Sequence, residues 1–70
     1  MAYTKDELLE AKKQIDSTLH KLYKTAKTLE AKENAERYKS QITLTKRRID
    51  AFELANHLIE EELERELQAL

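Results

Sequence analysis

The chain contains no cysteine, proline, glycine or tryptophan, and each absence narrows what it can be. Without cysteine there is no disulfide framework, no thiolate ligand for a metal and no thiol nucleophile. Without glycine there is no glycine-rich turn of the kind that holds phosphate groups. Valine is absent as well, and no segment alternates apolar and polar residues, so we predict no β-strand.

The abundant residues favour helix. Leucine, alanine, glutamate and lysine dominate the 70 residues, and all four are strong helix formers. A chain of this length makes one small domain, so we treat residues 1–70 as a single unit. No apolar run approaches the roughly 18 residues of a membrane-spanning helix, and the first residues lack the apolar core of a signal peptide. We therefore expect a soluble, cytoplasmic protein.

The first helix has a clear start signal. Thr4 and Glu7 have the spacing of a capping box, and Tyr3 and Leu8 have that of a hydrophobic staple. We predict a helix over about residues 4–33. Its apolar residues recur with an average spacing of about 3.5, which is typical of a helix that packs along another helix, although Lys12 interrupts the pattern. This seam comprises Leu8, Ile15, Leu19, Leu22, Ala26 and Leu29.

A second apolar seam predicts a helix over about residues 35–69. It comprises Tyr38, Ile42, Thr45, Ile49, Phe52, Asn56, Ile59 and Leu63. The seams are out of phase, because continuing the first beyond Leu29 reaches the polar residues Glu36 and Thr43. Asn34 is the best local breaker, since asparagine caps helices and tolerates a left-handed conformation. We therefore predict an all-α fold, a two-helix antiparallel hairpin that turns near residue 34. One long rod is the alternative.

A lone hairpin covers each seam residue on one side only, so we expect self-association into a four-helix bundle. Small residues flank the first seam, and the second helix has a surplus apolar side. The candidate oligomer interface is Leu44, Ala51, Leu54, Ala55, Leu58, Ala11, Thr18 and Thr25. Scattered surface apolar residues, which are normal on any protein, are the alternative explanation.

Charge is unevenly distributed along the chain. Residues 21–48 carry nine basic and three acidic residues, a net +6, which leaves −7 for the two terminal segments of a chain with net charge −1. Head-to-tail pairing brings opposite charges together, so we predict a homodimer of antiparallel hairpins. The alternative is a nucleic-acid-binding regulator that holds a polyanion with Lys21, Lys24, Lys27, Lys46, Arg47 and Arg48. The near-neutral net charge and the lack of an aromatic platform for bases argue against it.

Signs of site chemistry are few. Glu53, His57 and Glu61 share a helical face and could hold a divalent metal, but such a trio is more often a solvated stripe. Asn56 in the seam is expected to fix helix register and oligomer state. The carboxylates of residues 60–62 lack a pocket that would raise their pKa for acid–base catalysis. We predict a non-enzymatic interaction or scaffold protein, without cofactor, metal or small-molecule substrate, whose partners are itself and another helical protein.

Overall fold

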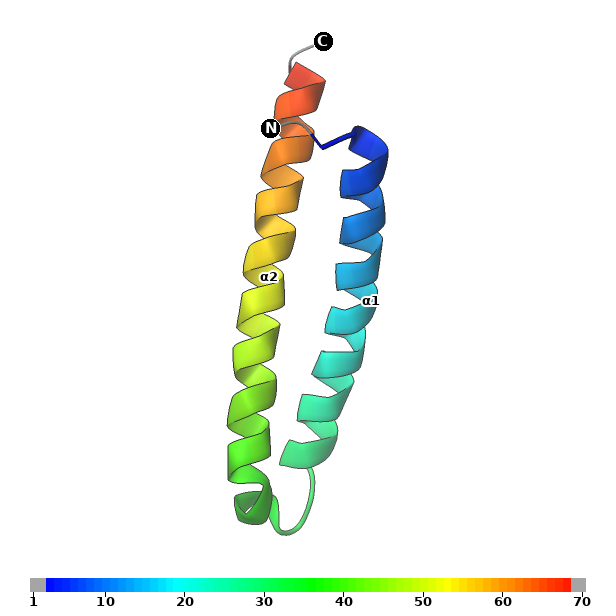
Figure 1. Cartoon of the computed structure of the whole chain (residues 1–70). Coiled ribbons are helices and arrows are strands. Elements are labelled where there is room, and N and C mark those ends of the chain that lie inside the picture. The colour runs from blue at the N-terminus through cyan, green and yellow to red at the C-terminus, as the bar shows by residue number, and fades with distance from the viewer. Residues whose placement is uncertain (1–2, 69–70) are drawn as a thin grey trace.

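The computed structural model, which describes residues 3–68, is an antiparallel pair of helices (Figure 1). Helix α1 spans Lys5–Glu30, a short 3₁₀ helix, η1, spans Ala35–Tyr38, and helix α2 spans Lys39–Gln68. The molecule measures 53 × 16 × 15 Å. The predicted all-α hairpin is therefore confirmed, and the rod is excluded. The predicted end of the second helix, at residue 69, lies outside the described residues.

The capping box predicted at the start of the first helix is present. The Thr4 Oγ1 accepts a hydrogen bond from the Glu7 backbone N–H at 3.1 Å, and the Glu7 Oε1 accepts one from the Thr4 backbone N–H at 3.1 Å. These bonds satisfy donors that a helix N-terminus otherwise leaves without partners. Tyr3 and Leu8 line one small recess together with Ile59 of α2, so the start of α1 is also tied to its partner helix.

The reversal of the chain differs from the prediction in detail. Helix α1 ends at Glu30, three residues before the predicted end, and the loop occupies Ala31–Asn34. The last turn tightens, because the Ala31 N–H donates to the Lys27 carbonyl at 3.1 Å and the Lys32 N–H donates to the Leu29 carbonyl at 3.4 Å.

Asn34 breaks the helix, but not in the way that its residue type suggested. No residue in the described part of the chain has a positive φ, and the Asn34 side chain makes no capping hydrogen bond. Its carbonyl instead accepts the Arg37 N–H at 2.9 Å and so begins η1. The second helical segment therefore starts at Ala35 as a 3₁₀ turn before it continues as α2.

The two seams meet along the length of the hairpin. Leu19, Ala26 and Ile49 form a buried cluster, against which Ile15, Leu22 and Phe52 pack. All predicted seam residues are buried or half-buried. Buried Thr45 donates its hydroxyl to the Gln41 carbonyl at 2.8 Å, so no polar group is left without a partner there. No described side chain, however, falls below 2% exposure, because each helix covers the other from one side only.

The register of the hairpin follows from one polar contact. The Lys12 Nζ donates to the Asn56 Oδ1 at 3.4 Å. Nearer the turn, Ile15 and Leu19 of α1 pack in one cluster with Ile49 and Phe52 of α2. The antiparallel order expected from the two sequence seams is thereby realised.

Truncation of Leu19 tests the seam. Leu19 is 6% exposed in the buried cluster, whereas Leu9 is 45% exposed. We expect Leu19→Ala to lower the free energy of unfolding by about 2–3 kcal/mol. The control Leu9→Ala should change it by less than about 0.5 kcal/mol. Urea denaturation at one protein concentration measures both, and equal losses would contradict this packing.

Candidate functional site

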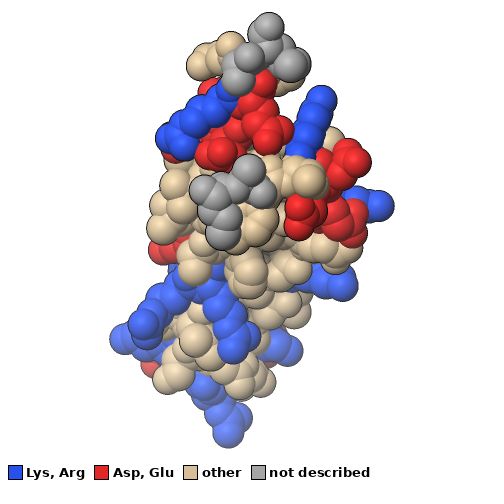
Figure 2. Space-filling view, turned by 45° about the horizontal axis from the view of Figure 1, so that its top comes forward, with Lys and Arg blue, Asp and Glu red and all other residues tan. Residues whose placement is uncertain are grey.

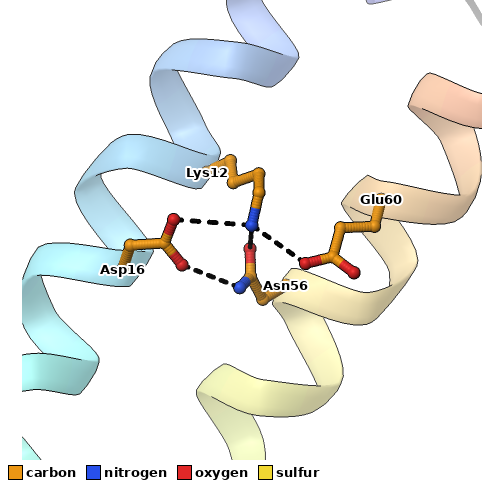
Figure 3. Close-up of polar contacts among 4 residues, drawn as sticks. All are labelled: Lys12, Asp16, Asn56 and Glu60. Carbon is orange, nitrogen blue, oxygen red and sulfur yellow. Dashed lines mark hydrogen bonds and ion pairs between the residues drawn. The ribbon is translucent and has the colours of Figure 1, made fainter.

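A polar cluster bridges the two helices in the half of the hairpin farther from the turn (Figure 3). Lys12 and Asp16 come from α1, and Asn56 and Glu60 come from α2. The Lys12 Nζ lies 2.9 Å from the Glu60 Oε1 and 3.4 Å from the Asp16 Oδ2. The Asn56 Nδ2 donates to the Asp16 Oδ1 at 2.9 Å. Lys12, Asp16 and Asn56 therefore each contact at least two members of the cluster, and Glu60 contacts Lys12 across the helices.

The cluster explains the interruption of the first seam. Lys12 occupies a seam position, and its side chain is only 29% exposed. Its hydrogen bond to Glu60 raises the pKa of Lys12 above its ordinary value; burial opposes this change, and Asp16 adds to it. A charged seam residue is thus retained because acceptors surround it. The sequence signal was available, since Asn56 interrupts the second seam at the facing position.

Two further side-chain contacts join the helices. The Tyr23 hydroxyl donates to the Glu53 carboxylate, and the Lys46 Nζ lies 2.9 Å from the Glu30 Oε1. Together with Asp16 and Glu60 these residues form one side of the hairpin, which we call the polar face. Each member directly follows a seam residue in the sequence, and the polar face comprises Asp16, Tyr23, Glu30, Lys46, Glu53 and Glu60.

The opposite side of the hairpin carries a row of small and apolar residues. Residues that follow a seam residue meet on the polar face, so residues that precede one lie on the other side of both helices. The small and apolar residues of this second side, which we call the apolar face, are Ala11, Thr18, Thr25, Leu44, Ala51, Ala55 and Leu58. Polar residues that also precede a seam residue lie beside them, among them Glu7, Gln14, Lys21, Gln41, Arg48 and Glu62. In the described part of the chain, all hydrogen bonds and ion pairs between side chains of α1 and α2 involve the seam or the polar face.

The apolar face contains seven of the eight residues predicted for an oligomer interface. Leu44 and Leu58 are 47% and 55% exposed. Thr25 donates its hydroxyl to the Lys21 carbonyl at 3.0 Å, so its polar atom is satisfied within α1. Leu54 is the exception: at 60% exposure it lies midway between Phe52 and Asn56 on the helix, and so points away from α1.

The candidate metal trio, which the sequence made the less common alternative to a solvated stripe, is not assembled. His57 pairs with Glu61 at 3.0 Å, whereas Glu53 accepts the Tyr23 hydroxyl instead. Among residues 3–68, no three histidine or acidic side chains lie close enough together to hold a metal ion.

The basic residues gather toward the turn, and acidic residues gather toward the opposite end (Figure 2). The six basic residues predicted to hold a polyanion are exposed, but they do not form one face. Lys24 and Lys27 line a recess with Tyr23, whereas Arg48 precedes a seam residue and lies beside the apolar face. Lys46 is already paired with Glu30.

No protein family model, curated protein or solved structure matches this chain. Neither helix in residues 3–68 combines the length and the apolar character needed to cross a membrane.

The Tyr23–Glu53 contact makes stability depend on pH. Its hydrogen bond to Glu53, then burial, and then the carboxylate charge raise the pKa of Tyr23. A raised folded-state pKa means that the stabilisation is complete below the unfolded value of about 10 and is lost as the pH rises through the folded value. The raised pKa of Lys12 acts in the same direction.

We expect Glu53→Gln to lower the pKa of Tyr23 and to reduce the loss of stability above about pH 10. Ultraviolet titration of the tyrosines and urea denaturation at several pH values measure the two effects. The control Glu61→Gln removes a carboxylate that contacts His57 rather than a tyrosine. Identical tyrosine titrations for wild type and Glu53→Gln would refute the contact.

Proposed function

We propose that this chain is a non-enzymatic helical interaction protein that works as a homodimer of hairpins joined through their apolar faces. One observation carries the proposal. The apolar face exposes Leu44 and Leu58 beside a seam in which no described side chain is fully buried. A second copy supplies the missing layer and completes a four-helix bundle.

The energetics of the single hairpin support a partner. Full burial of a leucine or isoleucine contributes about 1.5–3 kcal/mol, and half-covered seam residues contribute less. Ordering the chain costs about 1.5 kcal/mol per residue. The free energy of unfolding left to a single hairpin is therefore small. Burial of the leucines and alanines of the apolar face against a second copy would increase it.

Charge favours a head-to-tail dimer. The turn-proximal half carries +6 and the terminal segments carry −7, a segregation that is visible over the surface (Figure 2). Head-to-tail packing sets the basic half near the turn, with Arg48 beside the apolar face, over the acidic terminal half of the partner. Exposed ion pairs contribute about 0–1 kcal/mol each, so they select between geometries while apolar burial supplies most of the affinity.

The polar face supports a structural rather than a catalytic role. Its open groove is lined by Asp16, Tyr23, Glu53 and Glu60, and all four side chains are already engaged across the seam. Leu54 and Leu67, each 60% exposed, lie outside the apolar face. They give the dimer an outer surface suited to a helix of another protein.

The second candidate function is polyanion binding by the basic end of the hairpin. The gathering of basic residues near the turn favours it (Figure 2). It requires the basic ends of both protomers to lie together, because one hairpin spreads its cations around its circumference. The orientation of the dimer therefore separates the two functions.

Leu58→Glu tests the interface. Burying a carboxylate at this position on both subunits should weaken dimerisation more than tenfold, since about 1.4 kcal/mol per dimer already has that effect. Leu9→Glu is the matched control, because Leu9 is similarly exposed, at 45%, but follows a seam residue on the side of the polar face. Sedimentation equilibrium measures both. Equal masses for the two variants at every concentration would refute the interface.

Spin labels on Lys32→Cys test the orientation. Lys32 lies in the loop, where its Nζ is 5.4 Å from the centre of the Tyr38 ring. In a head-to-tail dimer the two labels lie near opposite ends of a 53 Å hairpin, so we expect a separation of several tens of Å by pulsed electron spin resonance. A short separation would overturn this orientation and favour a shared basic surface for a polyanion.

A further inference from the structure

A head-to-tail orientation and an interface through the apolar faces together allow only one arrangement of the four helices of the dimer. This step rests on the proposed function, a head-to-tail dimer joined through the apolar faces. The two-fold axis of such a dimer lies between the two stacked hairpins. It runs perpendicular to the helices and parallel to the plane of each hairpin. Such an axis places α2 antiparallel on the partner's α2, and α1 antiparallel on the partner's α1.

On α2 the apolar face contains a row with its own symmetry. Leu44, Ala51 and Leu58 are seven residues apart, so an antiparallel copy of the row matches it when the central residues coincide. Ala51 then meets the partner's Ala51, and Leu44 meets the partner's Leu58. A small residue at the centre allows the helices to approach closely while the leucines fill the space on either side.

On α1 a second row has the same property. Ala11, Thr18 and Thr25 are also seven residues apart, and they are symmetric about Thr18. Thr18 therefore meets the partner's Thr18, and Ala11 meets the partner's Thr25. This row contains only small side chains, which suits close approach of the two α1 helices.

The two centres lie at the same level of the hairpin. Thr18 falls within the seam step Ile15–Leu19, and Ala51 falls within the seam step Ile49–Phe52. These two steps lie beside each other, because Ile15, Leu19, Ile49 and Phe52 pack in one cluster. We propose that a single two-fold axis passes through Thr18 and Ala51, so that each residue contacts its own copy across the dimer.

A register displaced by one heptad is the competing arrangement. It centres the α2 pair between Leu54 and Ala55 and sets Arg48 opposite the partner's Glu61. It gains ion pairs, but it also sets Leu44 opposite the partner's Arg65 and separates the leucines. Exposed ion pairs contribute little, so apolar matching decides in favour of Ala51.

Single cysteine substitutions test the position of the axis. The chain has no cysteine of its own that could form other disulfides. We expect A51C and T18C to form disulfide-linked dimers under mild oxidation at least tenfold faster than the control A55C. A disulfide needs Cα atoms about 4.4–6.8 Å apart, which only residues on or beside the axis provide. Non-reducing electrophoresis gives the rates, and sedimentation under reducing conditions checks that each variant keeps the wild-type mass.

The outcomes separate this inference from the function on which it rests. Faster linkage of A55C in a chain that sediments as a dimer overturns the axis and leaves the homodimer intact. Linkage of A51C without that of T18C also overturns it, since α1 then does not lie on the partner's α1. A wild-type chain that is monomeric at every concentration refutes the homodimer itself.

Discussion

The hairpin depends on a polar contact placed within an apolar seam. Leucine and isoleucine side chains repeat every seven residues, and such a seam could slide by one heptad while it keeps most of its burial. A slide would remove Lys12 from Asn56 and Glu60, and would set its ammonium group against an apolar side chain. The cost of leaving that charge without acceptors selects one register. The positions of both faces follow from it.

Once the register is set, the chain uses its two sides differently. Residues that follow the seam pair across the helices, as Tyr23 does with Glu53 and Glu30 does with Lys46. Those side chains satisfy one another within a single hairpin. Residues that precede the seam include the small and apolar residues of the apolar face, such as Thr18 and Ala51, and in the described residues none of them makes a polar contact across the helices. One side therefore closes the hairpin, and the other is the side that we propose for a second copy.

The sequence was sufficient for the fold because two strong signals agreed. The cap at Thr4 gave the start of α1, and the change of phase between the seams required the chain to reverse. The predicted end of α1 lay three residues too far along the chain, because Ala31, Lys32 and Glu33 are all compatible with helix. Their place in the loop depends on where the seams first meet.

The faces were harder to predict, because they depend on contacts between helices. Glu53 appeared to belong with His57 and Glu61 on its own helix, but it binds Tyr23 of the other helix. Lys12 interrupts the apolar seam of its own helix, and its role depends on Asn56 of the other helix, which accepts a hydrogen bond from it. Spacing along one helix lists the side chains that are available, and only the register says which of them meet.

The loop of Ala31–Asn34 also has a consequence for folding kinetics. It closes a short connection with ordinary backbone angles, so most contacts near the turn are local and form early. The chain has no proline, so it has no slow cis–trans isomerisation during refolding. Pairing of the helices within one hairpin should finish well within a second. A slower phase whose rate rises with protein concentration would be the meeting of two hairpins in the proposed dimer.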